Sequence, residues 1–259
     1  KVSSIISQID FTKPFTIIKN NYVFKDKSNN ARDDKEPTNK TSKYVNDPYP
    51  DKENTNPIVY IYNTHQLEEY LKENTESYSV TPNVMMASYI LREKLANYNI
   101  SSLVEENNVS EILKMNNWNY ASSYKVTRML LEDAKSKNPT LKYFIDLHRD
   151  SVSKKISTTT INNKSYAKVL FIVGMENPNY QKNLNLTNRL QTLFESKYKG
   201  LSRGIYKKQG AGVNGVYNQD FNENTILIEV GGDQNTIYEV YNTIDAIADV
   251  LNEIIGGNG

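Results

Sequence analysis

Cysteine is absent from this chain of 259 residues, and its absence excludes disulfides, thiolate metal sites and cysteine nucleophiles. Any metal ion must therefore be held by nitrogen and oxygen ligands. Histidine is almost as scarce, because the chain has only two, His65 and His148. With so few histidines, their positions relative to the predicted strands become the most informative observation in the sequence.

Net charge and long apolar runs are also lacking. The 31 basic and 30 acidic side chains leave a formal charge of +1, so neither nucleic acid nor an anionic membrane surface is indicated as a partner. The sequence has no run of about 18 apolar residues, and its first residues do not follow the basic-then-apolar pattern of a secretory leader. The glycine-rich segment 207–221 lacks the spacing of a phosphate-binding loop, which argues against a nucleotide site.

Composition divides the chain into two parts. Residues 24–56 are almost devoid of aliphatic side chains and are dense in Asn, Asp, Lys and Pro. Such a composition buries too little apolar surface to offset its ordering entropy, so it predicts a flexible polar loop. We expect this loop to lie within an N-terminal extension, residues 1–56, and the main domain to span residues 57–259.

The main domain alternates between short apolar runs and longer segments of helical periodicity, which predicts an α/β fold. Because strands that alternate with helices form βαβ units, we expect a twisted, mostly parallel (mixed) sheet flanked by helices on both faces. Strands are predicted at residues 58–62, 102–106, 141–147, 167–174, 204–209, 216–221 and 225–232, and helices at 83–99, 112–137, 178–198 and 236–257.

Both histidines follow predicted strands. His65 comes shortly after the first strand, and His148 comes directly after the third. The last strand contains a carboxylate, Glu229, in an otherwise aliphatic run. Active sites of open α/β sheets lie beyond the carboxyl ends of the strands, so these three side chains are expected to converge.

Glu68 follows His65 by three residues, close enough for one tight turn to present both side chains to a common point. His65, Glu68 and His148 thus form a predicted ligand set for one Zn²⁺ ion, with a fourth position open for water. The ion would lower the pKa of that water to about 7, and Glu229 would serve as the catalytic base. If the register of the turn differs by one residue, Glu69 is the first alternative ligand.

A plainer interpretation competes for each residue. A single histidine after a strand is more often a hydrogen-bonding loop residue, and Glu229 alone could be a buried ion-pair partner. Their joint placement favours the metal site.

The neighbours of His148 offer supporting groups. Asp146 or Asp150 could accept its second ring proton, as carboxylates behind metal-bound histidines do. Alternatively, Asp146 points outward and Asp150 caps a turn. Arg149 could hold a carboxylate or carbonyl of the substrate, or form a surface ion pair.

Three sequence blocks resemble the catalytic domain of the stage II sporulation protein P family, within the zinc N-acetylmuramoyl-L-alanine amidases. They are IVYIYNTHQLEEY, KYFIDLHRDS and YNQDFNENTILIEVGGDQNT. By position, His65 and His148 match the zinc histidines, Glu68 the acidic residue of the first block, and Glu229 the catalytic glutamate. Asn235, in the last block, is expected to bind substrate or support the site.

Two positions depart from the resemblance. Asn63 stands where the family often has a histidine, and we expect it to alter a polar contact on the side of the strand that carries His65. The broader amidase group takes its zinc glutamate from farther along the chain. Here SVTPNVMMASY offers no carboxylate, and the nearest preceding one is Glu76.

The resemblance implies that residues 57–259 form an amidase domain that cleaves the bond between N-acetylmuramic acid and L-alanine of peptidoglycan. It also implies a role in septal wall remodelling during sporulation engulfment, stage II sporulation proteins D and M as partners, and, in some members, endopeptidase activity. We expect an extracytoplasmic location and a membrane anchor that precedes this chain. Two alternatives are an H-x-x-E zinc carboxypeptidase and a non-catalytic module that binds the cell wall.

Overall fold

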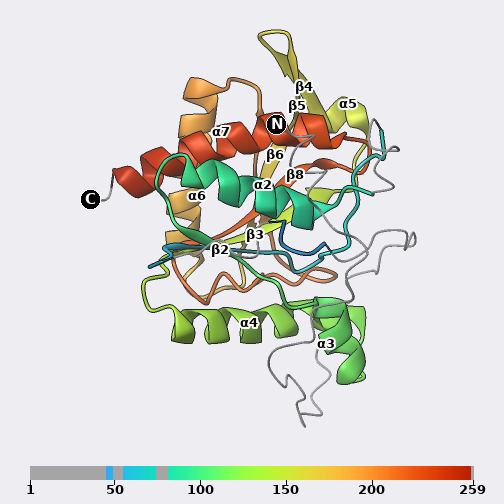
Figure 1. The fold of residues 1–259 in the computed structure, drawn as a ribbon, viewed down its shortest axis with the longest axis vertical. Helices are drawn as coiled ribbons and strands as arrows, with labels where there is room; N and C mark the ends of the chain where they lie inside the picture. The colour runs from blue at the N-terminus through green and yellow to red at the C-terminus, as the bar shows by residue number, and fades with distance from the viewer. Residues whose placement is uncertain (1–44, 49–54, 74–80, 258–259) are drawn as a thin grey trace.

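The computed structural model describes residues 45–48, 55–73 and 81–257 (Figure 1). Six strands form one sheet in the order β2-β1-β3-β8-β6-β7. β2, β1, β3 and β8 run parallel, β6 is antiparallel to β8, and β7 is parallel to β6. The predicted mostly parallel, mixed sheet is thereby confirmed. The strands are β1 (Val59–Tyr62), β2 (Ser102–Val104), β3 (Tyr143–Asp150), β6 (Val169–Gly174), β7 (Ser202–Lys208) and β8 (Thr225–Gly232).

Helices cover both faces of this sheet, as expected. Figure 1 shows α2 and α7 on one side and α4 on the other. Side chains of α6 join the core on the α2 and α7 side. The helices are α2 (Val84–Ala96), α3 (Val109–Met115), α4 (Ser123–Lys137), α5 (Lys154–Ser157), α6 (Tyr180–Lys197) and α7 (Ile237–Gly256), with a 3₁₀ helix, η2, at Tyr120–Ser122.

Successive side chains of β1 point to opposite faces of the sheet and so pack in two different hydrophobic clusters. Val59 and Ile61 pack in the large core with α2 and α7, whereas Tyr60 and Tyr62 pack with residues of α4. All four side chains are buried, as is usual for a parallel strand covered on both faces. The same alternation in β3 and β8 decides which face carries their polar residues.

Local sequence also sets where helices begin. Asn83 caps α2 by accepting from the backbone N–H groups of Met85 and Met86. Thr236 and Glu239 form a capping box at the start of α7. Such caps satisfy backbone donors that lack a partner within the helix.

Two predicted elements are wrong. The segment 112–137 is not one helix, because α3 ends at Met115 and Asn117 adopts a left-handed φ of 53° before η2 and α4 begin. The segment 216–221 forms turns rather than a strand, and Tyr217 and Asn218 both have φ of 54°. Asparagine tolerates this conformation better than most residues, so an Asn-rich stretch ends regular structure without Gly or Pro.

A hairpin was not predicted, and neither was the short helix α5 that precedes it. β4 (Thr158–Ile161) and β5 (Lys164–Ala167) form an antiparallel hairpin that projects from the body in Figure 1. Its turn residues, Asn162 and Asn163, both have positive φ, which suits a tight two-residue hairpin turn.

Part of the predicted flexible loop 24–56 packs on the main domain. Val45 is fully buried, and its carbonyl accepts a hydrogen bond from the Tyr89 hydroxyl of α2. Asp47 forms a two-pronged ion pair with the buried Arg92 of α2, at 2.5 and 2.7 Å. Most of the predicted extension lies outside the described residues. Among the described helices, none is long and apolar enough to cross a membrane.

Candidate metal centre

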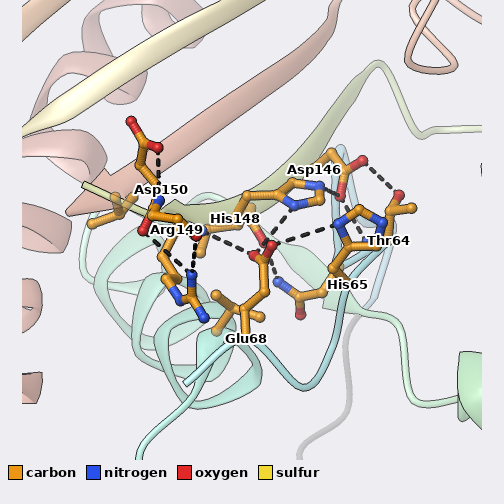
Figure 2. Close-up of polar contacts among 12 residues, drawn as sticks. Thr64, His65, Glu68, Asp146, His148, Arg149 and Asp150 are labelled. Atoms are coloured by element: carbon orange, nitrogen blue, oxygen red, sulfur yellow. Dashed lines mark hydrogen bonds and ion pairs between the residues drawn. The ribbon is translucent and has the colours of Figure 1, made fainter. Parts of the chain in front are cut away.

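Three side chains able to hold a metal ion meet near the carboxyl ends of β1 and β3. His65 and Glu68 lie in the turn after β1, whereas His148 lies within β3, which runs three residues farther than predicted. One ligand atom from each residue falls within 4.8 Å of the others. Glu68 lies between the two histidines: its Oε1 is 3.5 Å from His65 Nδ1, and its Oε2 is 3.3 Å from His148 Nδ1 (Figure 2).

Backbone and amide contacts fix the turn that carries His65 and Glu68. The Glu68 N–H donates to the His65 carbonyl, and the Glu68 carbonyl accepts from Val84 N–H at the start of α2. Gln66, between them, is buried; its amide donates to the Asn107 carbonyl and accepts from the first backbone N–H of α3. The turn is therefore tied to two helices, and its ligand atoms are held in place before any ion binds.

Asp146 lies behind His148. The two side chains share a face of β3, and Asp146 Oδ1 is 2.9 Å from His148 Nε2, although outside hydrogen-bond geometry. Asp146 is fully buried and accepts two hydrogen bonds from Thr64, one from the backbone N–H (2.9 Å) and one from the hydroxyl (2.6 Å). Burial alone would lower the pKa of His148, but the negative charges of Asp146 and Glu68 outweigh it and raise that pKa well above its usual value.

His65 is oriented by aromatic rings. Tyr120 of η2 stacks on its imidazole with centroids 4.8 Å apart and planes 21° apart, and Tyr124 of α4 meets it edge-on at 5.7 Å. His65 Nε2 is buried and has no hydrogen-bond partner among the described residues. The two histidines thus differ, because a carboxylate supports His148 and two tyrosines fix the plane of His65.

Glu68 is held in its charged form. Burial opposes ionisation of this carboxyl, but the nearby His148 and His65 outweigh burial and keep its pKa well below its usual range. The backbone N–H of Arg149 also donates to its Oε2, at 3.0 Å. A carboxylate that stays ionised between two imidazoles is a suitable metal ligand.

Glu229 lies beside the three-residue cluster but outside it. In the parallel ladder between β3 and β8, Glu229 is the register partner of His148, so the two side chains leave the sheet on the same face. Burial, reinforced by the charges of Glu68 and Asp150, raises the pKa of Glu229 to about 7, against the opposing charge of His148. Its Oε2 is buried without a hydrogen-bond partner among the described residues.

The side chains of Arg149, Asp150 and Asn235 bond to neighbouring segments of the chain. Arg149 donates from its guanidinium to the Glu69 carbonyl (2.9 Å) and to the Ser151 hydroxyl (2.9 Å). Asp150 pairs with Arg203 at 2.7 Å and does not reach His148. Asn235 is fully buried and accepts from Gly232 N–H, so it shapes the end of β8 rather than facing a ligand.

Asn63, the first departure from the resemblance, is not part of the ligand set. β1 ends at Tyr62, and Asn63 donates to the Leu147 carbonyl (2.5 Å) and accepts from the Ser88 hydroxyl of α2 (3.0 Å). Asn63 therefore joins α2 to β3. The expectation that Asn63 and His65 share one face of a strand is wrong, because β1 ends before both residues. Glu76 lies outside the described residues.

The cluster fits a zinc ion. With zinc–ligand bonds of about 2.0–2.1 Å, tetrahedral ligand atoms lie about 3.3 Å apart. Glu68 Oε1 lies 3.5 Å from His65 Nδ1 and Glu68 Oε2 lies 3.3 Å from His148 Nδ1, which is close to that spacing. The ionised carboxylate of Glu68 is also a suitable ligand.

Sequence reasoning did not single out Thr64, Tyr120 or Tyr124. Thr64 directly precedes His65, but its bonds to Asp146 depend on how β1 and β3 pair. Tyr120 lies in η2, between α3 and α4, and the prediction of one continuous helix gave no reason to expect this position.

A family match and a relative with a similar sequence point to the same family. Residues 9–252 match the family described as Stage II sporulation protein P. A relative named "Stage II sporulation protein P", from Bacillus subtilis (strain 168), is 38% identical over 203 residues, which cover 76% of this chain and 51% of the relative. The chain therefore spans about half the length of that relative. The solved structure "Cwp6 from Clostridium difficile" matches with a TM-score of 0.45 and 11% identity, over 76% of this chain and 29% of that chain.

Proposed function

This chain belongs to the stage II sporulation protein P family, and we propose that it is a zinc-dependent peptidoglycan hydrolase. The bond cleaved is the amide between N-acetylmuramic acid and L-alanine of the stem peptide. The observation that carries the proposal is the cluster of His65, Glu68 and His148 with Glu229 on the adjacent strand. A metal site with a nearby carboxylate that is not a ligand is the arrangement that metal-assisted amide hydrolysis requires.

Each residue has a separate role. His65, Glu68 and His148 hold the ion, and Asp146 orients His148. When bound, zinc supplies Lewis acidity toward the amide carbonyl and lowers the pKa of a water molecule. Glu229 takes the proton from the attacking water and gives it to the leaving nitrogen of L-alanine. Its pKa of about 7 suits a group that must first accept a proton and then donate it.

Because the chain spans about half of its curated relative, the cellular setting is part of the proposal. We assign the activity to septal wall remodelling during sporulation engulfment, outside the cytoplasmic membrane and anchored to it. Stage II sporulation proteins D and M are the expected partners, and endopeptidase activity is a second reaction to test.

A zinc carboxypeptidase would need an arginine to hold the free carboxylate of its substrate. The guanidinium of Arg149 is already bonded to the Glu69 carbonyl and the Ser151 hydroxyl. These bonds favour a structural role for Arg149, and so they favour the amidase.

The test combines metal analysis with a digest of purified peptidoglycan. We expect about one zinc ion per chain, and soluble products with a free L-alanine amino terminus and intact muramic acid. His148→Ala should lose zinc and activity, whereas Glu229→Gln should keep zinc and lose activity. Glu223→Gln, at a surface ion pair with Lys182, is the matched control and should change neither. Normal product release by both site variants would refute the proposal.

A further inference from the structure

Arg203 of β7 reaches across the sheet to the end of β3. Its Nη1 donates to Asp150 Oδ2 at 2.7 Å, and the two side chains are 17% and 23% exposed. β6 and β8 separate the two strands, so the backbones of β3 and β7 lie about 14 Å apart. The two side chains must therefore extend toward each other over β6 and β8 in order to meet.

A β-bulge in β7 turns Arg203 toward the sheet face that carries Glu229. Ser202 is the register partner of Val169 and its hydroxyl bonds to α6, so Ser202 faces the core on the α2 and α7 side. Successive side chains of a strand alternate, so Arg203 leaves on the other face. The register shifts directly afterwards, where Gly204 has a φ of 95°. Bulges of this kind re-aim a side chain and often occur beside active sites.

One row of side chains joins the metal centre to Arg203. His148 is the register partner of Glu229, and Glu229 is the register partner of Leu170 on β6. β7 continues the row, because the register shift places Arg203 and Gly204 opposite Leu170. Arg203 is therefore the last member of a row that begins at a predicted metal ligand and passes the carboxylate of Glu229.

The guanidinium of Arg203 has donors to spare. A guanidinium has five N–H donors, and the bond to Asp150 uses one of them. Arg203 has no other hydrogen-bond partner among the described residues. Because Asp150 fixes the guanidinium and balances its charge, the remaining donors suit a neutral acceptor such as an amide carbonyl.

We propose that Arg203 binds the peptide arm of the substrate by donating a hydrogen bond to the carbonyl of L-alanine. The inference rests on the proposed function, which puts the scissile carbonyl at the metal centre and the leaving nitrogen beside Glu229. From β3 to β8, the scissile bond then points toward β6 and β7. The peptide arm begins at the leaving nitrogen, so it continues over Leu170, and the L-alanine carbonyl is its first acceptor on the way to Arg203.

The experiment uses two neutral probes that differ in this carbonyl. They are the amides of N-acetylmuramic acid with L-alaninamide and with isopropylamine, and the second lacks the carbonyl. Binding is measured by calorimetry on the zinc-loaded Glu229→Gln chain, alone and combined with Arg203→Lys or Arg203→Ala. Lysine keeps the charge beside Asp150 but not the planar set of donors. Lys207→Gln, at an exposed position on the other face of β7, is the matched control.

We expect either change at Arg203 to weaken binding of the alaninamide probe about tenfold, the loss of one hydrogen bond from a charged donor. Binding of the isopropylamide probe should stay the same, and the control should alter neither. In the active chain, Arg203→Lys should raise KM for the alaninamide probe and leave kcat nearly unchanged.

Equal losses for both probes, no loss for the alaninamide probe, or no measurable binding would overturn the assignment. If the wild-type chain cleaves neither probe but this pattern of binding appears, the proposed reaction fails and the role of Arg203 stands.

Discussion

Replacing Asp146 by asparagine tests how the metal centre is organised. The change keeps the size of the side chain and removes its charge. In the structure Asp146 is fully buried, lies 2.9 Å from His148 Nε2 and accepts two hydrogen bonds from Thr64. An asparagine has one acceptor oxygen, so it cannot support His148 electrostatically and also accept both bonds from Thr64.

Two measurable losses follow from this geometry. Removing a carboxylate behind a metal-bound histidine typically weakens metal affinity about 10- to 100-fold. Leaving a buried donor of Thr64 unpaired costs about 1–3 kcal/mol of folding free energy. Zinc affinity is read by competition with a chelating dye, and the free energy of unfolding of the metal-free chain by urea denaturation.

Asp150→Asn is the control for this prediction. Asp150 is as close to His148 in sequence as Asp146 is, but it pairs with Arg203 and makes no contact with the histidine. The control should keep wild-type zinc affinity. If Asp146→Asn binds zinc normally, or if the two variants lose affinity equally, the role assigned to Asp146 is refuted.

Three further predictions concern orientation, protonation and stability. Tyr120→Ala should weaken zinc binding about 2- to 10-fold, the value of one aromatic pair, whereas Tyr120→Phe keeps the stacking on His65 and should match wild type; equal losses in a dye competition would contradict this. The pKa of His148 is raised, so an ion must displace the proton on this imidazole. Zinc affinity should therefore be weaker at pH 6 than at pH 8, by about tenfold for each pH unit below that pKa. Zinc affinity that does not change with pH would show that His148 is not a ligand. Arg92→Ala leaves the carboxylate of Asp47 without its buried partner and should lower the free energy of unfolding by about 3 kcal/mol in urea; a loss below about 0.5 kcal/mol would mean that residues 45–48 add little to stability.

The strands that form the site were predictable from the sequence. β1, β3 and β8 are short apolar runs, and a parallel sheet buried on both faces requires such runs. Their parallel order then brings their carboxyl ends to one edge. The breaks in regular structure at asparagine residues were not predicted. Asn117 breaks a helical pattern, and Asn162 and Asn163 make a hairpin turn, although none of these positions has the Gly or Pro that usually marks a break.

The choice between Asp146 and Asp150 depended on one irregularity. In a regular strand both would share the face of His148, because side chains alternate with a period of two. The register of β3 against β8 shifts between His148 and Asp150, and Asp150 instead pairs with Arg203. No residue type in DLHRDS marks this shift, so the sequence left both carboxylates open. The stacking of Tyr120 on His65 was hidden for a similar reason, since it depends on how separate elements pack.

Strand direction and alternation together determine the side from which a substrate reaches the metal centre. β6 is antiparallel to β8, so the row of adjacent carboxyl ends stops at β8, and Glu229 is its last member. In β3 and β8 the residues that alternate with His148 and Glu229, such as Leu147 and Ile228, are buried in the core beneath α2 and α7. That face is closed by packing. On the proposed function, substrate would therefore approach from the α4 side, where η2 and the loop before β8 form the walls. On the proposed function, specificity would then depend on these irregular segments.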